Sequence, residues 1–196
     1  MSDKTSSFLD ALSDFERLSR GEREELVKLG ILTPTGELRD YRRPMAEAKP
    51  EKMVKRAIAA PEVLNEAYDY AKPSSFSRGL RLDFDGMAAL FISGTASVDE
   101  GGSTIHVGDF GAQCWRTYRN IDALLQSEGA TWHDVVKTTC YLRDIERDYV
   151  QFNRIRTTFF HWLGLDPLPA SVGVQARLCR EDLLVEIEAI ALLSKR

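Results

Sequence analysis

The stretch Leu183-Leu184-Val185-Glu186-Ile187-Glu188-Ala189-Ile190-Ala191-Leu192-Leu193 decides the fold. Its side chains alternate between two faces, which is typical of a β-strand. One face is wholly apolar and consists of Val185, Ile187, Ala189 and Ala191. The other face combines Glu186 and Glu188 with large aliphatic side chains, whereas a solvent-exposed strand face is normally polar. We expect a second subunit to cover this face and to leave Glu186 or Glu188 at a partly buried site. The alternative is a two-sided core strand whose glutamates lie at an edge.

Composition narrows the class of protein. The chain has 196 residues, 43% of them hydrophobic, and a net charge of −4 with acidic and basic residues interleaved. This length accommodates one well-packed domain with an extension. Because no block of Lys or Arg is present, we expect no nucleic-acid partner. Apolar runs are too short for a membrane span or a signal peptide, so we expect no membrane association.

Cysteine and histidine spacing gives no indication of a disulfide framework or a metal centre. Three widely separated cysteines are typical of reduced thiols in a cytoplasmic protein, and they are Cys114, Cys140 and Cys179. The three histidines form no HxH or HxxxH pair. We therefore expect neither a metal nor another cofactor.

Residues 1–73 are predicted to form a helical N-terminal extension with a linker. A first helix is expected over 6–18, where apolar residues recur on one helical face, and a second over 22–29. Residues 40–52 are charged, contain two prolines and are typical of a linker. A third helix is expected over 62–70, because Pro61 suits a first helical turn.

Residues 74–196 are predicted to form an α+β domain in the order ββαβαββ. The expected strands are 79–84, 87–93, 135–142, 171–178 and 183–193, and the expected helices are 110–127 and 147–163. The second helix is expected to turn five apolar residues inward, namely Tyr149, Phe152, Ile155, Phe159 and Trp162. Two helices can cover only one face of the mixed sheet, so the uncovered face predicts a homo-oligomer.

Five motifs in this domain resemble the RidA/YjgF family in order and spacing. They are 91–95 (FISGT), 129–139, 152–160, 169–171 (PAS) and 176–191, and the resemblance spans about 74–193. It implies the chorismate-mutase-like α+β fold and a homotrimer whose sheets form a central barrel. It also implies three clefts between subunits, which agrees with the uncovered sheet face.

The resemblance further implies a chemistry. Active RidA proteins hydrolyse reactive enamines and imines made from amino acids, such as 2-aminoacrylate, and release ammonia and a 2-oxo acid. Glu186 matches the family's water-positioning glutamate. The other matched substrate-binding positions are Ser93, Asn153, Ser171, Phe76 in place of a tyrosine, and Ala170 in place of an arginine that holds the substrate carboxylate. This last departure removes a bidentate anion clamp.

A narrower resemblance is to the C-terminal half of the chorismatases, which remove pyruvate from chorismate on a similar fold. It rests on the runs 94–113, 171–174 and 179–188. It implies that Gly94, His106 and Cys179 line the substrate site and that Glu186 is the acidic residue.

We therefore predict a hydrolase or lyase that acts on a small carboxylate-bearing metabolite, with Glu186 as general acid or base. Burial raises the pKa of a carboxyl group, which suits such a role. Ser93 and the backbone amides of the Gly94-Thr95 turn are candidates to bind a substrate oxygen. Arg78 or Arg177 is a candidate anion-binding residue. The alternative is a non-catalytic metabolite-binding or assembly protein of the same fold.

Overall fold

The structure is a computed structural model that describes residues 27–28, 32–37, 53–71, 73–84 and 86–194. The chain divides into two compact units, residues 1–49 and 50–196. In the first unit, the Gly36 amide donates a hydrogen bond of 2.9 Å to the Thr33 carbonyl and closes a turn. The helix predicted over 6–18, most of that predicted over 22–29 and the linker over 40–52 lie outside the described residues.

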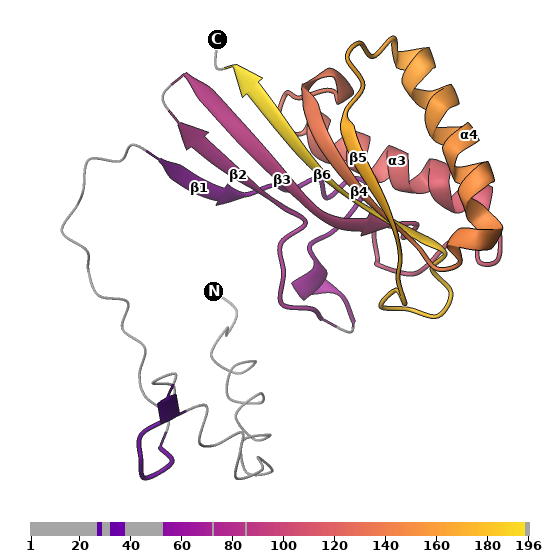
Figure 1. Cartoon of the computed structure of the whole chain (residues 1–196). Coiled ribbons are helices and arrows are strands. Elements are labelled where there is room, and N and C mark those ends of the chain that lie inside the picture. The colour runs from indigo at the N-terminus through magenta and orange to yellow at the C-terminus, as the bar shows by residue number, and fades with distance from the viewer. Residues whose placement is uncertain (1–26, 29–31, 38–52, 72, 85, 195–196) are drawn as a thin grey trace. The chain divides into compact units, whose positions relative to one another are not determined.

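The second unit is built on a six-stranded sheet with the strand order β1-β2-β3-β6-β4-β5 (Figure 1). The strands are β1 (Val54–Ala57), β2 (Gly79–Phe84), β3 (Met87–Ala96), β4 (Val135–Leu142), β5 (Ala170–Gln175) and β6 (Val185–Ser194). Neighbouring strands are antiparallel except β4 and β5, which are parallel. The final strand thus occupies an inner position, between β3 and β4.

Two helices, α3 (Phe110–Gln126) and α4 (Ile145–Leu163), lie on one face of this sheet (Figure 1). Each begins at an aspartate whose carboxylate accepts a hydrogen bond from the first turn: Asp109 caps α3 and Asp144 caps α4. Gly164 ends α4 at φ 67°, a left-handed conformation that favours glycine. From β2 onward the order is ββαβαββ, as predicted.

The apolar face of β6 forms the centre of the core. Val185, Ile187, Ala189 and Ala191 are at most 1% exposed and pack in one cluster with residues of both helices. Burying each of the larger of these side chains contributes about 1.5–3 kcal/mol to folding. Cys114 and Cys140 are also buried in this core.

The segment before β2 differs from the prediction. Residues 54–57 form the edge strand β1, which pairs with β2, although this segment was assigned to the N-terminal extension. The helix predicted over 62–70 is wrong, because only the 3-10 helix η2 (Ala67–Asp69) forms there. Burial of Ile58 and Leu64 in the domain core overrides the local helical tendency. The compact unit that contains the sheet spans residues 50–196.

The inward face of α4 is narrower than predicted. Phe152 and Ile155 are buried, but Tyr149 is 44% exposed and Trp162 is 79% exposed. Apolar periodicity indicates the centre of a buried helical stripe but not its width. Trp162 is therefore available at the surface, beside half-buried Phe159.

The second face of the sheet has no helix over it within the described ranges of unit 50–196 (Figure 1). Large apolar side chains lie exposed on this face, namely Phe84, Met87, Phe91 and Leu192, at 39–47% exposure. Glu186 and Glu188 lie on the same face of β6 as Leu192 and are half-buried. This uncovered apolar face is the feature that the sequence predicts a second subunit to cover.

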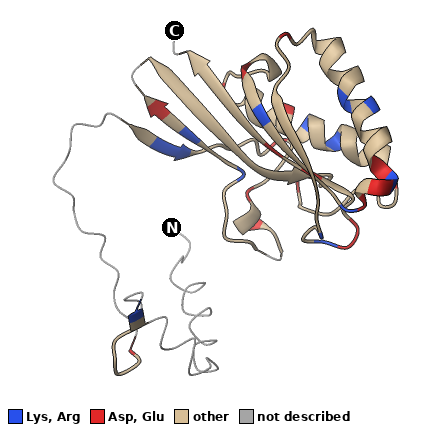
Figure 2. Cartoon of the chain, viewed as in Figure 1, with Lys and Arg blue, Asp and Glu red and all other residues tan. Residues whose placement is uncertain are grey.

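Charges are spread over several elements of unit 50–196. Figure 2 shows basic residues on β1 and along α4, whose first turn is acidic. Among the described residues, no helix is both long and apolar enough to cross a membrane.

Candidate functional site

A cavity of about 110 Å³ brings several predicted residues together. Its walls come from the segment before β2, the end of β3, the loop after β5 and the start of β6. The lining includes five residues that the sequence analysis selects, namely Phe76, Arg78, Gly94, Cys179 and Glu186. We call it the Glu186 cavity.

Glu186 supplies the carboxylate of this cavity. The side chain is half-buried, and burial raises its pKa above the ordinary range of a glutamate. The charge of Glu188 raises this pKa further, whereas the charge of Arg78 lowers it. A raised pKa lets a carboxyl group both donate and accept a proton near neutral pH.

Gly94 leaves the space that the Glu186 carboxylate occupies. A Cβ atom on residue 94 would lie 1.9 Å from Glu186 Oε1 and 2.9 Å from Cδ. Any larger residue at 94 would therefore displace the carboxylate. The backbone of β3 thus fixes where the acidic group lies.

Arg78 supplies a buried cation in the same cavity and is only 6% exposed. Its Nε donates a hydrogen bond of 3.0 Å to the Asn65 carbonyl, and Nη2 donates to the Tyr70 hydroxyl. The guanidinium carbon lies 4.8 Å from the Tyr70 ring centre and 5.3 Å from the Phe76 ring centre. Within the described part of the chain it forms no ion pair. Buried arginines are normally paired, so this group can bind an anion.

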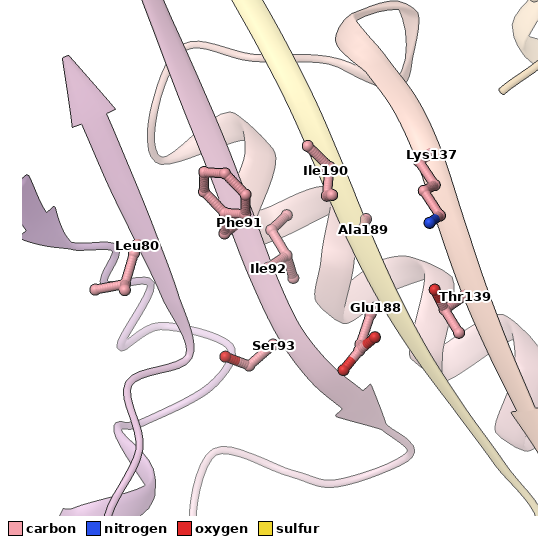
Figure 3. Close-up of a pocket in the computed structure, with 9 residues that line it drawn as sticks. All are labelled: Leu80, Phe91, Ile92, Ser93, Lys137, Thr139, Glu188, Ala189 and Ile190. Atoms are coloured by element: carbon pink, nitrogen blue, oxygen red, sulfur yellow. The ribbon is translucent and has the colours of Figure 1, made fainter. Parts of the chain in front are cut away.

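Ser93 lies at a different hollow, on the uncovered sheet face. This hollow of about 350 Å³ is lined by β2, β3, β6 and β4, and Ser93, Lys137, Thr139 and Glu188 supply its polar groups (Figure 3). Ser93 Oγ donates a hydrogen bond of 2.8 Å to the Ser77 carbonyl, and Glu188 accepts one of 3.0 Å from the Tyr141 hydroxyl. Neither Ser93 nor Glu188 lines the Glu186 cavity.

Asn153 and Ser171 meet at a third hollow, of about 230 Å³, between α4 and the start of β5. Arg156 joins them: its Nη1 donates to Ser171 Oγ at 3.1 Å and its Nη2 donates to Asn153 Oδ1 at 2.7 Å. Ala170 is exposed beside this group and pairs with Lys137 across the parallel strands.

His106 lies outside all three hollows. It is exposed in the loop before α3, and its backbone has a positive φ of 58°. Its carbonyl accepts a hydrogen bond of 3.2 Å from Gln113 Nε2. His106 does not line the Glu186 cavity.

Tyr70 and Arg180 are among the lining residues of the Glu186 cavity that the sequence analysis does not select. Tyr70 was assigned to a helix of the extension. Arg180 donates from Nη1 to the Gly102 carbonyl, a contact between distant loops. The sequence signal for this position is the run 179–188 that resembles the chorismatases, which contains Arg180. In the described portion of the chain, no group of three or more His, Cys, Asp or Glu residues is placed to hold a metal ion.

The chain is similar to proteins of one family. The family model described as Endoribonuclease L-PSP matches residues 73–193. A RutC family protein of Pyrococcus abyssi is 35% identical over 102 residues, which are 52% of this chain and 76% of that protein. The 3-aminoacrylate deaminase RutC of Acinetobacter baylyi is 31% identical over 102 residues, which are 52% of this chain and 77% of that protein.

Solved structures agree with this similarity. The YjgF gene product of E. coli aligns with a TM-score of 0.57 and 26% identity, over 72% of this chain and 99% of that chain. The Rid family protein YyfA of Yersinia pestis aligns with a TM-score of 0.56 and 26% identity, over 70% of this chain and 98% of that chain. The ββαβαββ order, the sheet covered by helices on one face and the match over residues 73–193 show that the chain belongs to the RidA/YjgF family, the Endoribonuclease L-PSP family.

Proposed function

We propose that the protein hydrolyses enamines and imines of small carboxylic acids, with Glu186 as acid and base and Arg78 as the residue that binds the substrate carboxylate. One observation carries this proposal: a half-buried carboxylate and a buried guanidinium without an ion pair in the described ranges line the same cavity. The similarity to a 3-aminoacrylate deaminase supports the reaction type.

The proposed reaction uses both protonation states of Glu186. An enamine accepts a proton on carbon from the protonated carboxyl group and becomes an iminium ion. The carboxylate then takes a proton from a water molecule whose oxygen adds to the iminium carbon. The resulting carbinolamine receives that proton on nitrogen. Its carbon–nitrogen bond then breaks while the hydroxyl proton returns to the Glu186 carboxylate, so that ammonia and a carbonyl acid leave and Glu186 is again protonated. Burial raises the pKa of Glu186, and a shift in this direction favours a group that must act in both protonation states.

The proposed assembly is a homotrimer, in which a neighbouring copy covers the uncovered sheet face. The exposed apolar residues on β2, β3 and β6 support it, because burying such a face is the main driving force for stable association. Replacement of Phe91 with Asp should convert the trimer to monomers in light scattering of the purified protein. A wild-type protein that is monomeric at micromolar concentration would contradict this part of the proposal.

A paired turnover assay tests the proposed reaction. One arm measures ammonia release from 2-aminoacrylate and from 3-aminoacrylate generated in place; the other measures pyruvate release from chorismate. We expect ammonia release that falls about 10²–10⁴-fold in Glu186→Gln, the typical contribution of a general acid or base. Ammonia release that Glu186→Gln leaves unchanged would refute the role of Glu186.

Pyruvate elimination from chorismate is the second candidate, and a specific observation favours it. Gly94 and Cys179 line the Glu186 cavity together with two arginines, Arg78 and Arg180, and two guanidinium groups suit a dicarboxylate. Pyruvate release that depends on Glu186 would establish this candidate. If both arms show no turnover, a metabolite-binding or assembly role replaces catalysis.

A further inference from the structure

A second cavity, unrelated to the Glu186 cavity, lies on the helical side of the domain. It has a volume of about 470 Å³ and is lined by α3, α4 and the 3-10 helix η3 (Trp132–Asp134). None of its lining residues lines the Glu186 cavity. Its volume is in the range of small-molecule sites. We call it the aromatic cavity.

Aromatic rings form a large part of its wall, and Phe159 contacts the rings of Trp115, Trp132 and Trp162. Trp115 meets Phe159 edge to face, with ring centres 6.0 Å apart and planes at 88°. Trp132 also meets Phe159 edge to face, with ring centres 5.2 Å apart and planes at 86°. Trp162 stacks on Phe159, with ring centres 6.3 Å apart and planes at 19°. Trp115 and Trp162 are 44% and 79% exposed, so two indoles border one hollow and remain accessible to a ligand.

A single carboxylate lies among these rings. Asp122 on α3 is half-buried, and its Oδ2 accepts a hydrogen bond of 2.6 Å from Gln126 Nε2. Burial raises its pKa, and no cation pairs with it within the described part of the chain. Indole faces and an unpaired carboxylate both attract positive charge, so the two features favour the same kind of ligand.

Two basic residues, Arg119 and His133, also line the aromatic cavity. Arg119 is exposed, lies one helical turn before Asp122 and forms no ion pair in the described segments. The cavity therefore offers a negative group among rings and a separate positive group. A ligand that carries both charges complements this arrangement, whereas a purely cationic ligand would meet Arg119.

We propose that the aromatic cavity binds a zwitterion that combines a methylated ammonium group with a carboxylate, the chemical class of betaines. The ammonium group lies against Trp115 and Trp162 with Asp122 as its counter-charge, and Arg119 binds the carboxylate. Methyl groups on the ammonium favour this site, because they contact the rings and weaken hydration of the charge.

Calorimetric titration of the full chain with glycine betaine, choline and glycine tests the proposal. We expect saturable binding of glycine betaine, weaker binding of choline and no binding of glycine. No saturable binding of glycine betaine would overturn the proposal, as would equal binding of glycine. Choline binding tighter than betaine binding would overturn the role of Arg119.

Variants separate this site from the Glu186 cavity. Trp162→Ala and Asp122→Asn should each weaken betaine binding roughly tenfold. Val150→Ala, a matched control on α4 that is 81% exposed and does not line the cavity, should leave it unchanged. Glu186→Gln should also bind betaine like the wild type. If Trp162→Ala has a native circular dichroism spectrum and binds betaine as the wild type does, the aromatic site is refuted. This outcome does not depend on whether the proposed hydrolysis occurs.

Discussion

Replacing Gly94 with alanine should remove activity without unfolding the protein. The new Cβ would lie 1.9 Å from Glu186 Oε1, and ordinary contacts begin at about 3.4 Å, so the carboxylate must withdraw by about 1.5 Å. A misplacement of 1 Å can reduce the rate about 10²-fold, or by about 2.7 kcal/mol. We therefore expect kcat/KM for enamine hydrolysis to fall at least about 10²-fold.

The fold should tolerate this change for two reasons. Gly94 lies within β3 and is not among the glycines with positive φ, so alanine fits its backbone. The clash is with the end of a flexible side chain, which can rotate away. Where alanine fits, Gly→Ala stabilises by about 0.4–1 kcal/mol. Urea unfolding should thus show a midpoint equal to or above that of the wild type.

Gly101→Ala is the matched control, since its Cβ would meet only Asp99 Oδ1 at 3.5 Å, and it should retain full activity. In the double variant Gly94→Ala/Glu186→Gln, the two losses should not add, because both act through one carboxylate. Full activity in Gly94→Ala, or additive losses in the double variant, would refute the link between Gly94 and Glu186.

Three further predictions follow from the same geometry. Arg78→Gln should raise KM for carboxylate substrates more than it lowers kcat, and an unchanged KM in steady-state assays would contradict the anion-binding role. Glu186→Gln should be more stable than the wild type at high pH. The folded-state pKa of Glu186 is raised, so the wild type loses stability as the pH rises from the ordinary glutamate range through the folded-state pKa. In urea unfolding, the stability difference between the two proteins should vanish in acid, and a difference that grows in acid would contradict the direction of this pKa shift. Phe152→Ala, in the fully buried core, should cost about 3–5 kcal/mol in urea unfolding, and a loss below about 1 kcal/mol would contradict its packing role.

Strongly periodic segments made most of the fold predictable. The alternation over 183–193 identified β6 and its buried face, because side chains on a strand have a period of two. β1 was not predictable, since its four residues include Lys55 and Arg56 and are all exposed. Such an edge strand forms because β2 offers hydrogen-bonding partners, and this information lies outside the segment itself.

The candidate site was predictable only where a motif marks it. Glu186 and Gly94 belong to motifs, and the structure places them in contact. Tyr70 was not predictable, since its contact with Arg78 depends on how the segment before β2 packs. Trp162 was expected inside, because periodicity does not reveal how far neighbouring elements cover a helix.

The central claim is that Glu186, and not its neighbour on the same strand face, carries the chemistry. The most direct test compares kcat/KM for ammonia release in the wild type, Glu186→Gln and Glu188→Gln at equal oligomeric state. Glu188 lines the hollow on the sheet face and not the Glu186 cavity, so it is the matched control. We predict a fall of about 10²–10⁴-fold in Glu186→Gln and a much smaller change in Glu188→Gln. Equal losses in the two variants, or none in Glu186→Gln, would contradict the account.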